Sequence, residues 1–462
     1  MTHPSGLLLW SAAVLLCAGA AWAAAVVSRI AAVGAAYKAK VLASGMFVSG
    51  RDAGSMLEDV SADSYRMFRL WRAEPDMEAR AVKASLLGLR PRTAVFRPGL
   101  GATLAIGVGP EALAARAPRT QPSPPASRPW PEGGAGAPEA PPALAAVVRD
   151  SFRELEGRKR RRTRAVVVVQ DGRLLAERYA PGFSPAMPLA GWSMAKSVLN
   201  ALVGVLVGQG RLSVDDRSLL PEWRGPADAR AEISLDDLLR MRSGLEFSEA
   251  YTDPLSDVVR MLFASPSAAS FAAAKPLRRR PGTCWSYSSG TSNILSRVVR
   301  LAVEKAGEDY HAFPRSVLFE RLGMSGAVLE PDAAGEFVCS SFMFATARDW
   351  ARFGLLYAQD GAWGGGRLLP EGWVAYSVSP TPQSPGGRYG AHWWLKLTRE
   401  LGGESPAAGR IPGDAFFALG HEGQVLTVIP SRRLVVVRLG LSVQVDAWDH
   451  AGFLSRLLDV LP

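Results

Sequence analysis

Residues 193–210 read Ser-Met-Ala-Lys-Ser-Val-Leu-Asn-Ala-Leu-Val-Gly-Val-Leu-Val-Gly-Gln-Gly, and they carry the most structural information in the chain. The apolar run from Val198 to Gln209, which ends at Gly210, predicts a buried helix. Ser193 and Lys196 are three residues apart, so they share one face at the start of this helix. Serine is a weak nucleophile without an adjacent base, and lysine becomes such a base when burial lowers its pKa. The pair therefore predicts a nucleophile and a base.

Two further motifs follow this pair in the chain. Residues 285–290 read Trp-Ser-Tyr-Ser-Ser-Gly and come after a turn at 281–283. Residues 421–424 read His-Glu-Gly-Gln and precede two apolar runs, 425–429 and 434–439, which predict adjacent strands. The chain thus contains S-x-x-K, Y-x-S and H-x-G in that order.

In this order the motifs resemble those of the β-lactamase-related serine hydrolases. That family includes class C β-lactamases, D-alanyl-D-alanine carboxypeptidases, and esterases and amide hydrolases of the 6-aminohexanoate-dimer hydrolase type. The resemblance covers about residues 145–460 and also includes residues 238–245, 345–354 and 368–373. It implies an α+β, β-lactamase/transpeptidase-like fold: an antiparallel sheet flanked by helices, with an inserted, mainly helical region.

Two departures from the class C pattern bear on the substrate. Ser289 stands where class C β-lactamases usually have asparagine, and His421 stands where they have a lysine. Both changes resemble the amide hydrolase and esterase branch, so we expect a small-molecule amide, peptide or ester substrate and not a β-lactam. Two alternatives remain: an enzyme like the D-alanyl-D-alanine carboxypeptidases, or a catalytically silent relative that binds peptides or cell-wall fragments.

The resemblance implies acyl transfer in two steps. Ser193 becomes acylated, while Lys196 and Tyr287 share the proton transfers, and either of them can be the base. Both would then need pKa values nearer neutrality: burial would lower that of the lysine, and its ammonium would lower that of the tyrosine.

Further residues of the motifs have implied roles around the substrate. The backbone N–H groups of Ser193 and Gln424 would form the oxyanion hole. Gly423 would leave room for the substrate, and Ser289 would contact it. His421 would hydrogen-bond either the substrate or Tyr287, and it is also interpretable as a structural residue of the strand edge.

Other segments bear on the cleft and on cofactors. Residues 245–263 carry an acidic cluster (Glu246, Glu249, Asp253 and Asp257) that we expect to form a rim able to hold a substrate ammonium, and residues 389–394 are a second candidate edge. The alternative is that these acids are solvated loop residues. The sequence has no Walker A loop, no G-x-G-x-x-G after a strand and no metal-ligand spacing, so we predict no cofactor and no metal.

An uncharged apolar run at residues 6–27 is long enough to span a bilayer. Residues 21–23 (Ala-Trp-Ala) offer a signal-peptidase site, so residues 1–33 are predicted to be a signal peptide or a membrane anchor. We expect the protein to be exported, either periplasmic or anchored to the inner membrane. One observation opposes export: Arg29, Lys38 and Lys40 follow the run while no basic residue precedes it, which favours a cytoplasmic C-terminus.

The rest of the chain divides by composition. Residues 34–116 are predicted to be a small separate unit with short helices within 54–72 and strands at 93–96 and 103–106. Residues 117–143 are a proline-rich linker, since the stretch 118–142 holds nine prolines. Residues 144–462 form the hydrolase domain, which begins with a helix at 145–157.

The overall composition is that of a globular protein. The 462 residues are 48% hydrophobic and 21% charged, with a formal net charge of +10. A basic cluster at residues 158–164 suggests contact with an anionic partner, but we interpret it as a solvated helix end and expect no nucleic-acid partner. Whether Cys284 and Cys339 form a disulfide is left open.

Overall fold

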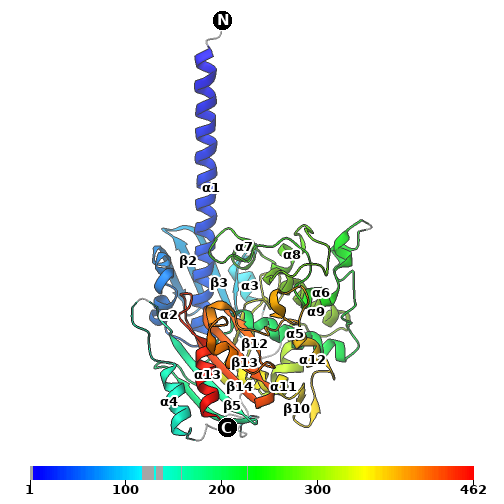
Figure 1. Ribbon diagram of the computed structural model, residues 1–462. Coiled ribbons are helices and arrows are strands. Elements are labelled where there is room, and N and C mark those ends of the chain that lie inside the picture. Colours follow the sequence, from blue (N-terminus) through cyan, green and yellow to red (C-terminus); the bar gives the residue numbers. More distant parts are fainter. Residues whose placement is uncertain (1–3, 117–129, 132–138, 158, 226, 462) are drawn as a thin grey trace.

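The structure is a computed structural model that describes residues 4–116, 130–131, 139–157, 159–225 and 227–461. It has the predicted α+β architecture, with a central antiparallel sheet, a largely helical region on one side, and a long N-terminal helix that extends away from the body (Figure 1).

The central sheet joins the start and the end of the hydrolase domain, in the strand order β12-β13-β14-β5-β6. Its strands are β5 (Thr163–Gln170), β6 (Arg173–Tyr179), β12 (Phe416–Gly420), β13 (Gln424–Ile429) and β14 (Leu434–Gly440). The valine run of β5 is completely buried because both faces of the sheet are covered. Helix α11 (Ala347–Ala358) packs on one face, and α4 (Pro142–Asp150) and α13 (His450–Val460) cover the other. The helix predicted at 145–157 is thus real but ends at Asp150.

The helical region lies between two strands of a small sheet, β7 (Leu189–Ala190) and β9 (Met343–Ala345), with β8 (Val328–Leu329) at its edge. Its elements are η2 (Trp192–Met194), α5 (Ala195–Gly208), η3 (Pro221–Trp223), η4 (Ala229–Glu232), α6 (Leu235–Leu239), α7 (Asp257–Ala264), α8 (Ala268–Ala273), α9 (Ser289–Lys305), η5 (Arg315–Phe319) and α10 (Glu320–Leu322). The region after α11 contains β10 (Ala362–Trp363), β11 (Gly366–Arg367), α12 (Trp373–Val378), and the short turns η6 (Pro385–Gly387), η7 (Arg399–Leu401), η8 (Pro406–Arg410), η9 (His421–Gly423) and η10 (Pro430–Arg432).

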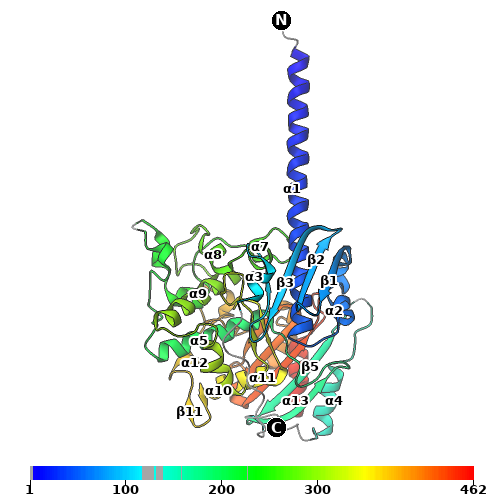
Figure 2. The same ribbon diagram turned by 180° about the vertical axis from the view of Figure 1, so that it is seen from behind.

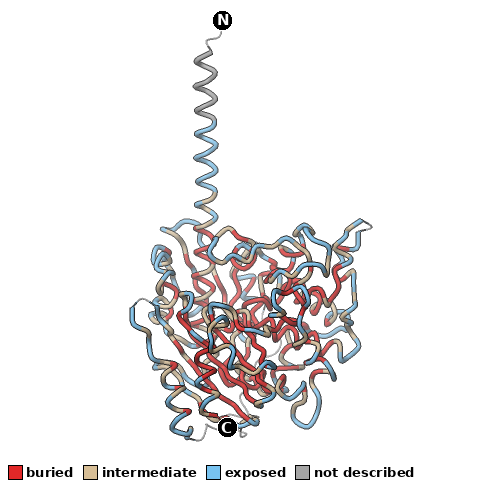
Figure 3. The backbone as a smooth tube through the Cα atoms, viewed as in Figure 1, coloured by how far each residue is buried: buried red, intermediate tan, exposed pale blue. Residues whose placement is uncertain are grey.

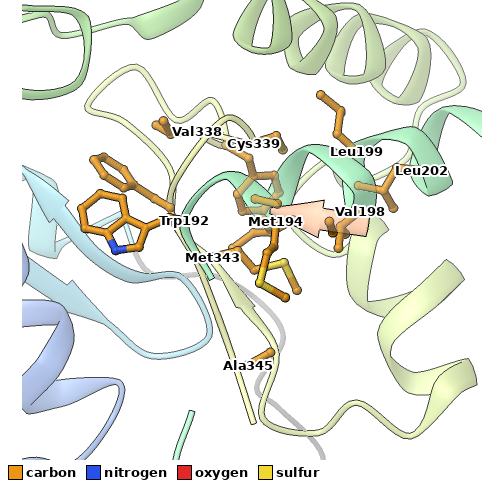
Figure 4. Close-up of a cluster of buried hydrophobic side chains, with 14 of the residues drawn as sticks. Trp192, Met194, Val198, Leu199, Leu202, Val338, Cys339, Met343 and Ala345 are labelled. Carbon is orange, nitrogen blue, oxygen red and sulfur yellow. The ribbon is translucent and has the colours of Figure 1, made fainter. Parts of the chain in front are cut away.

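Helix α5, predicted from its apolar run, is buried along nearly its whole length. Figure 4 shows Met194, Val198, Leu199 and Leu202 in one apolar cluster with side chains of the segment 338–345. The residues on both sides of Ser193, Trp192 and Met194, are themselves buried in the core. The backbone that carries the serine is therefore fixed by packing.

The N-terminal helix α1 runs without a break from Pro4 to Phe47. Figure 3 shows that the helix is mostly exposed over residues 15–30 and that its last turns enter the body of the protein. Ala35, Ala36, Ala39 and Leu42 are completely buried, since small side chains allow close approach of the surrounding backbone. The boundary predicted at residue 33 therefore falls inside one helix.

A four-stranded antiparallel sheet packs against this inner half of α1, in the order β1-β2-β3-β4. It consists of β1 (Trp71–Asp76), β2 (Ala81–Leu86), β3 (Leu89–Arg97) and β4 (Gly101–Leu104), accompanied by α2 (Ala53–Asp59), η1 (Asp63–Leu70) and α3 (Pro110–Ala114). Strands β3 and β4 overlap the predicted ones, whereas β1 and β2 were missed; the residues of the outer strand β1 are mostly polar and exposed.

The segment 34–116 is not a separate unit, contrary to the sequence expectation. Most of its buried hydrophobic residues belong to the same cluster as α5 and the rest of the helical region, while Ala81, Val95 and Leu113 form a small cluster of their own. Polar contacts reinforce this packing: Arg162 and Arg164, from the basic cluster, form ion pairs with Asp63 and Asp59. Part of the basic cluster thus forms ion pairs within the protein, so the cluster is not simply a solvated helix end.

Most of the predicted linker 117–143 lies outside the described residues. Within the described part, Trp130 binds the turn between β5 and β6, because its Nε1 donates to the carbonyl oxygen of Gly172 at 3.0 Å. Helix α4 already begins at Pro142, one residue before the predicted end of the linker.

Candidate active site

Ser193 and Lys196 meet as the sequence predicts. Ser193 lies in η2 and Lys196 in the first turn of α5, with the lysine Nζ 3.1 Å from the serine Oγ. The amine is buried and also donates to Ser289 Oγ at 3.1 Å and to the carbonyl oxygen of Ser340 at 2.8 Å. Burial lowers the pKa of Lys196 to about 8. A substantial fraction of neutral amine therefore exists near neutral pH, as a general base requires.

Ser289 connects the lysine to the half-buried carboxylate of Glu249. Its Oγ donates to Glu249 Oε1 at 2.5 Å and its backbone N–H donates to Oε2 at 2.8 Å. Burial raises the pKa of Glu249, and the negative charge of Glu249 in turn raises the pKa of Lys196 against the effect of burial. Glu249 therefore lies behind the lysine and not on an acidic rim, and Ser289 is completely buried instead of lining the cleft.

Tyr287 stands on the other side of the lysine. The Lys196 Nζ is 4.9 Å from the centre of its ring, and the phenol lies close enough to the Ser193 side chain for that side chain to lower the pKa of Tyr287. The sequence led us to expect a lowered pKa, but burial raises the pKa of Tyr287 well above its usual value. The reason is its aromatic setting, since its ring lies 5.9 Å from that of Tyr389 and 5.4 Å from that of Trp394.

The cleft in front of Ser193 is formed by loops around the end of the central sheet. Its lining residues are Ser193, Tyr251, Tyr287, Trp394, Thr398, Glu400, Leu401, Leu419, Gly420, His421, Glu422, Gly423 and residues 442–448. The lining includes three carboxylates (Glu400, Glu422 and Asp446) and neither lysine nor arginine. The expected acidic rim thus exists, but other loops supply it. Among the described residues, no group of three or more His, Cys, Asp or Glu side chains is placed to hold a metal ion.

The H-x-G motif is the turn η9 between β12 and β13. Both Glu422 and Gly423 have positive φ, at 63° and 80°. A Cβ on Gly423 would lie 2.8 Å from Nη1 of Arg438, so this glycine, which also lines the cleft, makes room for a buried arginine. A Cβ on Gly420 would lie 2.2 Å from the carbonyl oxygen of Gly191, which shows how closely this turn approaches the backbone before Ser193.

Gln424, the first residue of β13, is buried, and its side chain binds the carbonyl oxygen of Gly440 at 2.7 Å. The side chain of Gln424 is thus occupied by hydrogen bonding within the sheet. The assignment of its backbone N–H to an oxyanion hole stays a prediction.

His421 has aromatic neighbours on several sides. Its Nε2 is 2.9 Å from the hydroxyl oxygen of Tyr65, and its ring stacks on that of Tyr251 with centroids 5.2 Å apart. Trp192 contacts it edge-on at 5.5 Å. Tyr65 belongs to η1, and sequence reasoning missed it because no local pattern links residue 65 to residue 421.

The nucleophile is preceded by strained backbone. Trp192 has a φ of 50°, which is unfavourable for a residue with a bulky side chain. Its indole Nε1 donates to Glu422 Oε2 at 3.2 Å and so ties this segment to the H-x-G turn.

A buried lysine beside a serine, a tyrosine across from it, and an H-x-G turn at the sheet edge define a hydrolase of the β-lactamase-related class. The chain belongs to the Beta-lactamase family, whose model matches residues 148–443.

Individual relatives agree with this assignment. A 6-aminohexanoate-dimer hydrolase from Paenarthrobacter ureafaciens is 26% identical over 319 residues, which is 64% of this chain and 77% of that protein. A penicillin-binding protein homologue from Caulobacter crescentus has a similar fold, with a TM-score of 0.51 at 17% identity over 70% of this chain and 97% of that one. A family VIII carboxylesterase gives a TM-score of 0.50 at 16% identity, over 71% and 98% of the two chains. The structural neighbours establish the fold alone.

Proposed function

We propose that the protein is a serine hydrolase that cleaves an amide or ester bond through an acyl-enzyme on Ser193. The observation that carries the proposal is the 3.1 Å contact between Ser193 Oγ and the buried amine of Lys196, whose pKa is lowered to about 8. A nucleophile and a base of suitable pKa within hydrogen-bonding distance are what acyl transfer requires.

In the acylation step, neutral Lys196 accepts the proton of the Ser193 hydroxyl while the oxygen attacks the substrate carbonyl carbon. Ser289 and the carbonyl oxygen of Ser340 hold the lysine amine in place, and Glu249 stabilises the ammonium that forms. The backbone N–H groups of Ser193 and Gln424 receive the oxyanion, which makes a contribution of ~3 kcal/mol per donor in comparable sites.

Tyr287 serves as the acid for the leaving group. Its raised pKa keeps the phenol protonated, and its contact with Ser193 places the proton beside the bond that breaks. The Lys196 ammonium then passes its proton to the Tyr287 phenolate, which restores both groups. In the second step, water attacks the acyl carbon while neutral Lys196 accepts a proton of the water, and the ammonium returns that proton to Ser193 Oγ as the bond between this oxygen and the acyl group breaks.

The cleft favours a neutral or cationic substrate. Three carboxylates line it, and His421 occupies the place where class C β-lactamases have a lysine. A carboxylate-bearing antibiotic would be repelled by this lining. The curated relative is named as a hydrolase of the 6-aminohexanoate dimer, and the same amide and ester branch is the one we propose here.

We also propose that α1 anchors the enzyme to the inner membrane, with the catalytic domain on the periplasmic side. One helix among the described residues, Leu15–Phe47, is long and apolar enough to cross a membrane. The positive-inside argument against export weakens, because Lys38 and Lys40 are buried: Lys38 donates to the carbonyl oxygen of Trp71 and Lys40 to Glu330.

The test combines a covalent probe with a substrate panel. We expect a fluorophosphonate to label the full chain, Ser193→Ala to abolish labelling, and Ser286→Ala, which alters an exposed serine beside Tyr287, to keep it. Equal labelling of the Ser193→Ala variant would remove Ser193 as the nucleophile. The panel comprises p-nitrophenyl esters, D-amino-acid amides, 6-aminohexanoate oligomers and nitrocefin, and turnover of nitrocefin alone would contradict the proposed branch.

A further inference from the structure

One end of the four-stranded sheet lies where α1 leaves the protein. The indole Nε1 of Trp71, the first residue of β1, donates to the carbonyl oxygen of Ala31 at 2.8 Å. Trp71 pairs with Leu86, and Leu86 pairs with Leu89, so the turn at residues 87–88 belongs to this end. Figure 2 shows this end of the sheet beside the exit of the helix.

This end carries large apolar side chains that are more than half exposed to solvent. Leu87 is 85% exposed, Leu89 65%, Leu70 64% and Met67 54%. Exposed arginines alternate with them: Arg66, Arg69, Arg72 and Arg90. We call this set the exit face.

The opposite end of the same sheet has a different character. The turn between β1 and β2 exposes Met77 at 67%, but it is flanked by the acidic residues Asp76 and Glu78. That end is at the inner terminus of α1, where Phe47 contacts Phe96 of β3 at 5.8 Å. The sheet is thus apolar and basic towards the outer part of α1 and partly acidic away from it.

We propose that the exit face lies against an anionic lipid bilayer. The occupant follows from continuity: directly beyond this face, α1 exposes Leu15, Leu16, Trp22 and Val27, and residues 15–30 extend ~24 Å as a helix. Apolar side chains between arginines suit the headgroup region, where the leucines enter the acyl boundary and the guanidinium groups bind phosphate. The inference rests on the proposed role of α1 as an anchor.

This orientation places the catalytic cleft near the membrane. The 3₁₀ turn η1 carries Leu70 of the exit face at its end and Tyr65, which contacts His421, five residues earlier. At ~2 Å of rise per residue, about 10 Å separates the two positions. Substrates that approach along the lipid surface therefore arrive close to the H-x-G turn.

Site-specific quenching tests the exit face. The full chain, with Cys17 and the exposed Cys284 replaced by serine, is reconstituted into nanodiscs of phosphatidylcholine and phosphatidylglycerol with brominated acyl chains. A bimane label is attached to a cysteine at position 87, 77 or 27. We expect quenching at Leu87→Cys and Val27→Cys, and none at the matched site Met77→Cys.

The three labels separate the two proposals. Quenching at residue 27 but not at 87, or equal quenching at 87 and 77, overturns the exit face while α1 remains an anchor. No quenching at residue 27 overturns the anchor and the exit face with it. Replacing Arg66, Arg69 and Arg90 with glutamine should reduce quenching at residue 87 in anionic discs but not in purely zwitterionic ones. An equal response in both kinds of disc would show that the arginine charges do not contribute to the contact with the bilayer.

A second inference concerns Tyr65, which lies outside the part of the chain matched by the family model. Its phenol contacts His421 at 2.9 Å, and the negative charge of Glu422 lies close enough to raise the pKa of the phenol, so Tyr65 lies beside two residues of the H-x-G turn. Burial raises its pKa, which keeps the phenol neutral.

The turn η1 holds Tyr65 firmly because α1 fixes it from behind. Lys38 of α1 donates to the carbonyl oxygens of Phe68 at 2.9 Å and of Trp71 at 2.5 Å. The ring of Tyr37, also on α1, stacks on Phe68 with centroids 4.7 Å apart. The position of the phenol is thus set by the membrane-proximal helix.

The geometry points to Tyr65 as a positioning residue that orients His421 towards the substrate. This rests on the proposed hydrolase function. We expect Tyr65→Phe to raise KM for a short p-nitrophenyl ester about 3- to 10-fold with little change in kcat, the range that loss of one hydrogen bond gives. The matched control is Tyr179→Phe, since Tyr179 is half-buried and donates to Glu177 far from the cleft.

Two further measurements make the test decisive. In a His421→Gln background, Tyr65→Phe should have no additional effect on KM; a full additive effect would overturn the proposal. Independently of hydrolysis, the ring ¹⁵N resonance of His421, identified by its loss in His421→Gln, should shift in Tyr65→Phe but not in Tyr179→Phe. An unchanged resonance contradicts the positioning role of Tyr65. A shifted resonance in a chain without esterase activity counts against the proposed hydrolase function alone.

Discussion

Lys40 and Glu330 form an ion pair inside the protein, with Nζ of the lysine 2.5 Å from Oε2 of the glutamate. Both side chains are almost completely buried, although 290 residues separate them in the chain. Ser44 Oγ and the backbone N–H of Ala102 also donate to the carboxylate. The carboxylate of Glu330 therefore accepts hydrogen bonds from both α1 and β4. The N-terminal helix is therefore an integral part of the hydrolase core.

Lys40→Met should destabilise the protein by ~3–5 kcal/mol, because Glu330 is then left buried without a counter-ion. The free energy of urea unfolding in detergent measures the loss, with Lys305→Met on the exposed end of α9 as the control. If the unpaired charge is the cause, adding Glu330→Leu to Lys40→Met should restore part of the stability. A double variant less stable than the single one would argue against this explanation.

Truncations should distinguish the structural boundary from the compositional one. Removing residues 1–30 leaves the buried part of α1 in place, so we expect a folded and active protein that no longer partitions into membranes. Removing residues 1–116 uncovers the shared hydrophobic cluster, so we expect aggregation. Size-exclusion chromatography and probe labelling report both outcomes. A monomeric, labelled 117–462 fragment would show that the N-terminal segment is dispensable.

The local part of the site was predictable from the sequence. A spacing of three residues places Ser193 and Lys196 together on any helix, and the tyrosine and H-x-G motifs are short patterns with a fixed order. The central sheet was equally accessible, since its strands have strong apolar runs and the turn at Asp171–Gly172 favours a hairpin.

Long-range contacts explain what the sequence did not reveal. The partner of Ser289 is Glu249, forty residues away, and the partner of His421 is Tyr65, 356 residues away. The pKa of Tyr287 was predicted in the wrong direction because the sequence indicated the nearby lysine but not the aromatic shell that excludes water. Such effects depend on packing, which no short motif encodes.

The lowered pKa of Lys196 predicts the pH dependence of the reaction. The active form has a neutral amine, so kcat/KM for a short ester should be low below the pKa, rise with pH through about 8, and then level off. Stopped assays across this range in buffers of constant ionic strength measure the curve. A rate that is flat through this region would exclude Lys196 as the base.

The loss of kcat/KM caused by Tyr287→Phe should depend on the leaving group of the substrate. Because the phenol is proposed to protonate the leaving group, the variant should lose ~10²-fold or more on an amide. It should lose much less on a p-nitrophenyl ester, whose leaving group is stable as an anion. Comparing kcat/KM for the two substrates measures the difference, and equal losses on both would contradict an acid role for Tyr287.

Glu249→Gln should shift the pH profile without removing the base. The charge of Glu249 raises the pKa of Lys196, so its neutral isostere should move the rising limb of kcat/KM to lower pH while the amide still binds Ser289. At acidic pH, each protein can be compared with its own plateau at high pH. The variant should then retain a larger fraction of its plateau kcat/KM than the unaltered enzyme does. The control is Glu246→Gln in the same loop, because Glu246 is exposed and pairs with Arg278. The rising limb of kcat/KM could instead stay at the same pH in Glu249→Gln, or move equally in both variants. Either result would show that the carboxylate of Glu249 does not set the pKa of Lys196.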